Sequence, residues 1–163
     1  MNTALKTFVL LSYLVVGFQA NLPAQVCPKK LPVPDKTFLK NTNELDDQEV
    51  KYFEKYIGKI SEPKVLKTFP EGGKRCKTIQ RFKNGIVYQI DYCSESGATV
   101  FIDFPGYCKA ELVKYVEWFY KSEWNVWNKE KTHYQPKEDG TPGCYIDIKQ
   151  NKKGYYIAYY CGC

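Results

Sequence analysis

The chain has 163 residues, 7 of them Cys, and a formal net charge of +6. This length suits one ordinary domain that buries its own core without help from a metal ion. The Lys residues are spread along the sequence, so the charge predicts a solubilising surface rather than the concentrated basic stripe that nucleic-acid binding calls for. We therefore expect a single domain with no nucleic-acid partner.

The first 20 residues have the pattern of a cleavable secretory signal peptide. Lys6 supplies the positive start, Thr7–Gly17 is a short apolar run, and Ala20 offers a small residue at the cut. A membrane-spanning helix needs about 20 apolar residues, and this run is shorter. We expect residues 1–20 to be removed, which leaves 21–163 as one secreted, extracellular domain without a membrane anchor.

A short helical turn is expected near the N-terminus, behind a proline-rich entry segment. Val50, Phe53 and Ile57 recur at helical spacing. Gly58 follows directly and is the residue type that ends helices, because it accepts a left-handed backbone.

The clearest local signal is a β-hairpin. Runs 75–83 and 86–92 are typical of strands, and Asn84-Gly85 between them is a pair that favours a tight turn. The run 98–104 then alternates apolar and polar residues with a period of two, as a half-buried antiparallel strand requires. These three strands predict an antiparallel meander.

The second half of the chain continues the same pattern with one ambiguous stretch. Residues 109–127 contain apolar positions at helical spacing, but their aromatic and β-branched density favours a strand, which we predict here. A loop rich in Pro, Gly and charge follows over 135–143, and a last hairpin over 145–160 turns at 151–154. Several short strands joined by turns predict a mainly β fold, either a barrel or a sandwich.

The cysteines predict structural disulfides. A secreted chain meets oxidising conditions, so most of its Cys should pair. The sequence has no Cys-x-x-Cys, and a Cys-Gly-Cys end with one His elsewhere is poor spacing for zinc, so no metal site is expected. Because seven is odd, one thiol is either free or joined to another chain.

Catalytic arrangements are scarce. His133 is the only His, so Ser/His or Cys/His catalysis would depend on one side chain in a polar loop. Paired acids such as Asp46 with Asp47 lie in charged, turn-rich stretches, where helix caps and surface are the ordinary roles. We expect no enzyme activity and no cofactor.

Short motifs occur at both ends of the expected mature chain in an order found in a known family. Residues 56–59, 67–76 and 84–86, with the entry at Cys27-Pro28, resemble the opening of lipocalins of the apolipoprotein D and insect bilin-binding group. The end at 155–163 is similar to their strand that closes on Tyr-x-Cys-x-Cys. This chain lacks the hallmark Trp of that group and stops before their eighth strand and final helix.

The resemblance implies a lipocalin-like up-and-down barrel, here incomplete with seven strands. It also implies a disulfide between Cys27 and Cys161. Cys163 would be the odd thiol, free or linking a disulfide-bonded dimer, and Cys76 would need another partner. The candidates for that partner are Cys93, Cys108 and Cys144.

The side chains on one face of these strands would line a cavity or pack as an ordinary core. The candidate ligand-binding residues are Tyr88, Ile90, Tyr92, Val100, Ile102, Phe104, Tyr155, Ile157 and Tyr159. The first expected function is sequestering or carrying a small hydrophobic or amphipathic molecule in the barrel. The alternative is a secreted interaction protein, such as a protease inhibitor or toxin-like effector, that binds a host or extracellular protein through exposed loops or a patch formed by Trp118, Trp124 and Trp127.

Overall fold

The computed structural model describes residues 27–40, 45–93, 97–138 and 140–162. The predicted signal peptide and Cys163 lie outside these residues. The helical elements are α1 (Lys36–Lys40), α2 (Leu45–Tyr52), the π-helical turn η1 (Phe53–Ile57), the 3-10 turn η2 (Lys83–Gly85) and α3 (Lys109–Tyr120). The strands are β1 (Lys64–Thr68), β2 (Arg75–Arg81), β3 (Val87–Asp91), β4 (Gly97–Pro105), β5 (Asn125–Trp127), β6 (His133–Pro136), β7 (Gly143–Asn151) and β8 (Gly154–Gly162).

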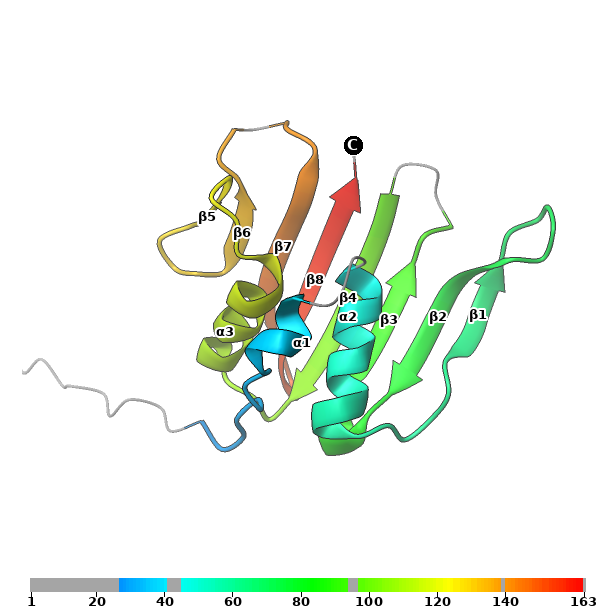
Figure 1. Ribbon diagram of the computed structural model, residues 1–163, viewed down its shortest axis with the longest axis horizontal. Helices are drawn as coiled ribbons and strands as arrows, with labels where there is room; N and C mark the ends of the chain where they lie inside the picture. Colours follow the sequence, from blue (N-terminus) through cyan, green and yellow to red (C-terminus); the bar gives the residue numbers. More distant parts are fainter. Residues whose placement is uncertain (1–26, 41–44, 94–96, 139, 163) are drawn as a thin grey trace, which may run out of the picture.

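Eight antiparallel strands form one sheet in the order β1-β2-β3-β4-β8-β7-β6-β5. The chain makes two meanders, β1–β4 and β5–β8, each preceded by a helix, and their last strands pair at the centre of the sheet. Within the described residues β1 and β5 are outer edges that do not pair with each other, so the sheet stays open (Figure 1). The mainly β, antiparallel prediction is confirmed, but the sheet has eight strands rather than seven and does not close into a barrel.

The tight hairpin predicted at Asn84-Gly85 is confirmed. Strands β2 and β3 pair antiparallel on either side of it. Asn84 has φ of 60° and Gly85 has φ of 81°, and a type I′ hairpin turn requires positive φ at both central residues. The alternating run that follows forms β4, as predicted, so β2, β3 and β4 make the expected meander.

Helix α3 occupies most of the stretch for which we predicted a strand, so that prediction was wrong. Leu112, Tyr115, Val116 and Phe119 are all buried, and their spacing places them on one stripe of a helix. Burying this stripe against the sheet outweighs the β propensity of the aromatic and β-branched residues around it, because such propensities are weak beside tertiary packing.

The predicted N-terminal helical turn is confirmed as α2 and η1. Gly58 ends it with φ of 99° and donates its N–H to the Phe53 carbonyl at 2.8 Å. Just before α1, the Asp35 carboxylate accepts the Phe38 N–H at 2.7 Å and the Tyr56 hydroxyl at 2.7 Å. Asp35 therefore caps α1 and ties it to η1.

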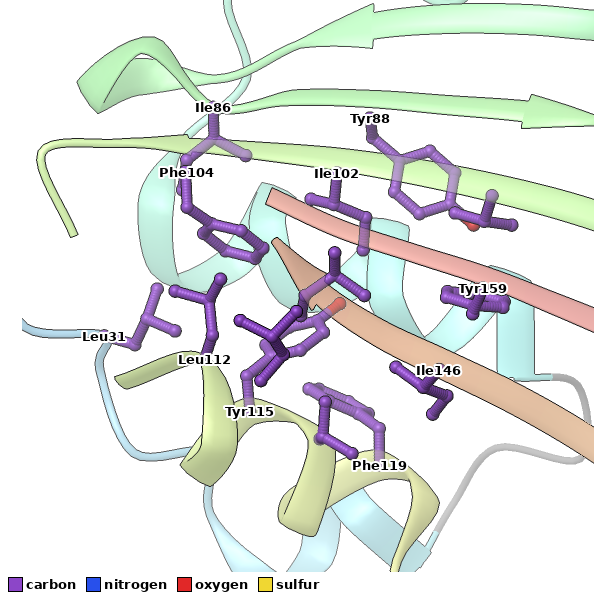
Figure 2. Packing of buried hydrophobic residues seen from close by; sticks show 14 of the residues in the cluster. Leu31, Ile86, Tyr88, Ile102, Phe104, Leu112, Tyr115, Phe119, Ile146 and Tyr159 are labelled. Carbon is purple, nitrogen blue, oxygen red and sulfur yellow. The ribbon is translucent and has the colours of Figure 1, made fainter. Parts of the chain in front are cut away.

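The described α-helices, α1, α2 and α3, lie on one side of the sheet (Figure 1). We call this side the covered face and the other side the open face. The core fills the space between the covered face and the helices (Figure 2). At its centre the Tyr115 ring lies 4.8 Å from that of Phe119 and 5.4 Å from that of Phe104, measured between ring centroids.

Three disulfides link six of the cysteines. The pairs are Cys27–Cys108, Cys76–Cys93 and Cys144–Cys161. The Cys27–Cys161 pair implied by the lipocalin resemblance is therefore wrong. In this sheet β7 and β8 are neighbours and place Cys144 directly opposite Cys161, so these two sulfurs meet. Cys163, and with it the predicted disulfide-linked dimer, lies outside the described residues.

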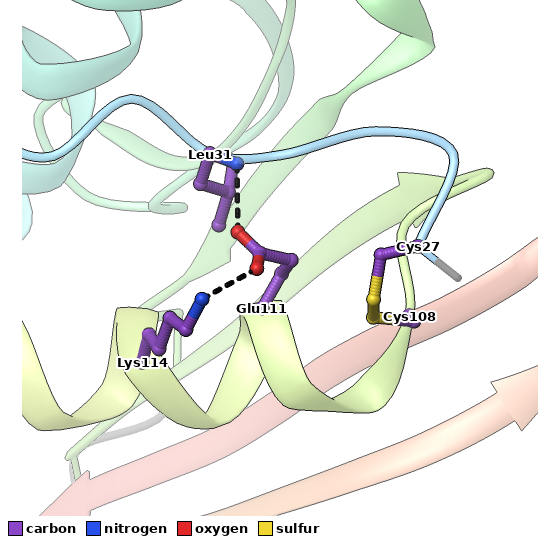
Figure 3. The surroundings of a disulfide bond; sticks show 5 residues. All are labelled: Cys27, Leu31, Cys108, Glu111 and Lys114. Atoms are coloured by element: carbon purple, nitrogen blue, oxygen red, sulfur yellow. Dashed lines mark hydrogen bonds and ion pairs between the residues drawn. A yellow bond between two sulfur atoms is a disulfide. The ribbon is translucent and has the colours of Figure 1, made fainter. Parts of the chain in front are cut away.

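The Cys27–Cys108 disulfide joins the entry segment to the start of α3 (Figure 3). Beside it, the buried Glu111 carboxylate accepts the Leu31 N–H at 2.9 Å and the Lys114 ammonium at 2.7 Å. Burial alone would raise the pKa of Glu111, but these hydrogen bonds outweigh it and lower the pKa. One covalent bond and one charged carboxylate thus fix the N-terminal arm on α3.

Candidate functional site

Most of the residues predicted to line a ligand cavity lie in the core. Seven are buried on the covered face: Tyr88, Ile90, Val100, Ile102, Phe104, Ile157 and Tyr159. Tyr155 is half-buried against the same cluster, and Tyr92 is 37% exposed next to Phe69. The strand alternation correctly placed them together, but helices α2 and α3 pack on them (Figure 2). Their role in binding a ligand stays a prediction.

A buried carboxylate lies among these side chains. Glu49, on α2, is fully buried. Its carboxylate accepts hydrogen bonds from the hydroxyl groups of Tyr115 and Tyr159, with oxygen–oxygen distances of 2.7 Å and 2.5 Å. Burial, and after it the negative charge of Glu49, raises the pKa of both tyrosines. Because these hydrogen bonds join α2, α3 and β8, the arrangement holds the helices on the sheet.

The open face carries an aromatic surface that the sequence analysis did not identify. On β8, Ile157 and Tyr159 point to the covered face. Successive side chains of a strand alternate, so Tyr156, Ala158 and Tyr160 point to the open face. We call the surface around Ala158 the aromatic platform. It consists of Phe101, Tyr145, Tyr156, Ala158 and Tyr160.

Strand register brings the platform residues together. Ala158 lies directly opposite Phe101 of β4, and Tyr160 lies opposite Tyr145 of β7. Directly opposite residues in an antiparallel pair have Cβ atoms about 5 Å apart, so these side chains are neighbours. Phe101 is 42% exposed. The small Ala158 side chain therefore leaves a shallow floor among larger aromatic groups.

A polar network borders the platform. The His133 ring bonds Asp147 through Nδ1 and Gln135 through Nε2, each at 2.6 Å, and Lys149 bonds the second Asp147 oxygen at 2.8 Å. Burial alone would raise the pKa of Asp147, but the hydrogen bonds from Lys149 and His133 lower it. Both nitrogens of the ring are engaged, so the structure places His133 in a hydrogen-bond network at the surface.

A cleft of about 590 Å³ lies beside the platform, between the start of β5 and the loop after β6. Trp124 lines it and is 73% exposed. The Tyr145 hydroxyl donates to the Thr141 carbonyl at 2.8 Å, and Thr141 also lines the cleft. The Tyr145 hydroxyl of the platform therefore lies next to one wall of the Trp124 cleft.

The other two Trp residues do not share this exposure. Trp118 packs against the core, with its ring 6.3 Å from that of Tyr52. Trp127 lies 4.9 Å from the Tyr134 ring. The predicted three-Trp patch is therefore reduced to Trp124. The stretch 135–143, predicted as a loop, contributes Pro136, Lys137 and Glu138 to the same cleft.

Within the described ranges, no group of three or more His, Cys, Asp or Glu side chains is arranged to hold a metal ion. None of the described helices has both the length and the apolar composition that crossing a membrane requires.

Comparison with known proteins gives no match. No protein-family model, no curated protein and no solved structure is similar to this chain at a significant level. The lipocalin resemblance therefore stays a prediction from sequence motifs.

Proposed function

We propose that this chain is a secreted, disulfide-bonded binding protein whose partner is another extracellular protein. The partner would rest on the aromatic platform and extend into the Trp124 cleft. The observation that carries the proposal is the platform itself, where Phe101 and three tyrosines lie on a sheet face that none of the described helices covers.

The chemistry of the surface supports this proposal. Tyr, Trp and Phe are enriched at protein interfaces, and Tyr and Trp dominate the residues whose removal weakens binding most. Exposed Trp124 adds a second anchor beside the platform. The Cys144–Cys161 disulfide joins the two strands that carry Tyr145, Tyr156 and Tyr160, so this surface is held rigid before binding.

The carrier function expected from the lipocalin resemblance has weaker support. It needs a cavity of a few hundred Å³ inside a barrel, whereas the predicted lining residues pack against helix side chains. The Trp124 cleft is large enough for a small molecule. Native mass spectrometry would detect such a ligand and so distinguish it from a protein partner.

The test compares three forms of the secreted protein on an array of purified extracellular proteins. Phe101→Asp alters the platform, and Val33→Asp is a matched control because Val33 is 73% exposed in the segment before α1. We expect at least one partner that binds the unmodified protein and the control alike, and that binds Phe101→Asp at least tenfold more weakly.

Two results would overturn the proposal. In the first, every partner found binds Phe101→Asp and the unmodified protein equally. In the second, native mass spectrometry of the secreted protein finds a retained small molecule and the array finds no partner, which would support the carrier function instead.

A further inference from the structure

The positive charge of this protein is concentrated in one part of the sheet. Residues 59–83 contain eight Lys or Arg and two Glu, a net charge of +6 that equals the net charge of the whole chain. The remaining residues contain sixteen basic and sixteen acidic side chains and are neutral overall. This basic stretch forms β1 and β2, at one edge of the sheet. The Lys residues are spread along the sequence, but acidic residues are scarce in 59–83, so the net charge is concentrated there.

Two grooves on the open face meet at Arg81 in this region. One, of about 330 Å³, is lined by Lys64 and Arg81 among others. The second, of about 300 Å³, is lined by Arg81 and Lys153. Together they cross the sheet from β1, over β2 and β3, to β4 and the turn between β7 and β8. At about 4.8 Å between neighbouring strands, this track is roughly 15–20 Å long.

Two acidic side chains line the track, and one of them is in an ion pair. Glu62, which lines the first groove, bonds Lys59 at 2.6 Å. Asp103, which lines the second, accepts a hydrogen bond from Asn151 at 3.3 Å. By contrast, none of the ion pairs among the described residues includes Lys64, Arg81 or Lys153. The described lining of the two grooves therefore carries three cations, Lys64, Arg81 and Lys153, against the two carboxylates of Glu62 and Asp103, of which Glu62 already pairs with Lys59.

The β1 edge itself is poorly suited to pairing with a further strand. Its register with β2 shifts on both sides of Lys67, and Lys67 lies directly opposite Lys77. Irregular register and Lys residues are the features by which natural edge strands resist strand addition. An occupant of this region would be held by side-chain charge and not by a backbone ladder.

We propose that the two grooves around Arg81 bind a linear sulfated polysaccharide. A chain that repeats its negative charges matches cations placed along a track. Single-stranded nucleic acid, the other linear polyanion, is held by aromatic side chains that stack on its bases. Among the described residues that line the two grooves none is aromatic, which favours the polysaccharide. This inference is independent of the protein partner proposed for the aromatic platform.

The test is chromatography on immobilised heparin with two matched triple variants. Lys64→Gln, Arg81→Gln and Lys153→Gln remove the charges that face the grooves. Lys36→Gln, Lys121→Gln and Lys129→Gln remove the same net charge from exposed positions elsewhere. Circular dichroism establishes that both variants are folded.

We expect heparin to retain the unmodified protein and the control variant at about 0.15 M NaCl, which is physiological ionic strength. The groove variant should elute at a lower salt concentration. The magnitude of the slope of log K against log salt concentration should fall by about three for the groove variant. Each cation that contacts the polyanion releases about one counterion on binding, and this variant lacks three such cations. Phe101→Asp should bind heparin normally, which separates this site from the platform.

Three outcomes would overturn the inference. The first is passage of the unmodified protein through heparin at that salt concentration. The second is an equal loss of affinity in both triple variants, which would show a net-charge effect without a site. The third is stronger competition for the grooves by single-stranded DNA than by heparin, which would assign them to nucleic acid.

Discussion

The covered and open faces of the sheet are built by the same strands but have different chemistry. On β4, Ile102 is fully buried under the helices while its neighbour Phe101 is 42% exposed on the other side. On β8, Tyr159 bonds the buried Glu49, while Tyr160 lies opposite Tyr145 on the open face. Both sets of alternating residues on these two strands therefore include aromatic side chains, and only one of the two sets forms the core.

The largest effect is expected at Glu49 on the covered face. Glu49→Ala leaves the Tyr115 and Tyr159 hydroxyls without their acceptor, and should lower the free energy of unfolding by about 4 kcal/mol, since each buried unpaired group costs about 1–3 kcal/mol. Urea denaturation measures this. Glu117→Ala is the control, because the Glu117 side chain is 40% exposed and should change stability by less than about 1 kcal/mol. Equal stability of the two variants would show that the buried carboxylate does not hold the helices.

A second experiment compares adjacent residues on the two faces. Ile102→Ala should lower the free energy of unfolding by about 3 kcal/mol, because it opens a cavity in the core. Phe101→Ala should lower it by less than about 1 kcal/mol, because its side chain is already in contact with water. Similar losses for both would mean that the open face is packed against something in solution, and sedimentation would then show whether that is a second copy.

The smallest expected effect is on acid stability. The lowered pKa of Glu111 means that its contribution to stability is present above the ordinary value of 4.5 and is lost as the pH falls through the lower, folded-state pKa. On the open face, hydrogen bonds from Lys77 and the Cys93 N–H lower the pKa of Asp91 below its ordinary value of 3.8. Its contribution to stability is therefore also lost as the pH falls through the lowered pKa.

Unfolding free energies measured between pH 7 and pH 2.5 check this expectation. Glu111→Gln should be less stable than the unmodified protein at pH 7, and the difference should narrow on acidification. Asp91→Asn should show a smaller difference, because the Asp91 side chain is 31% exposed and screened by solvent. A difference for Glu111→Gln that stays constant across the pH range would contradict the assignment of a charged carboxylate there.

Local signals in the sequence predicted local structure well. The Asn84-Gly85 turn and the alternation in 98–104 correspond to real strands, because turn chemistry and the period of a strand act over a few residues. Helix α3 was missed because its aromatic residues favour strands intrinsically. The helix is stabilised only when its apolar stripe is buried against the sheet, and that contact is not visible in the local sequence.

The candidate site was harder to predict for a related reason. Alternation shows that a strand has two unlike faces, but it does not show which face the helices will cover. Tyr155 and Tyr159 share one phase of β8, and Tyr156 and Tyr160 share the other, so the aromatic platform had the same signal as the core. The groove cations were missed because Lys64, Arg81 and Lys153 are brought together only by the order of strands in the sheet.

The central position of β8 has a consequence for how this protein is made. β8 follows every other described strand in the sequence, yet it lies between β4 and β7. While the chain emerges from the ribosome, β4 and β7 each present an unpaired edge, and such edges invite association with other chains. The local Cys76–Cys93 bond can form early, but Cys144–Cys161 has to wait for β8. Completion of the sheet and closure of its last disulfide are therefore expected to be late, linked events in synthesis.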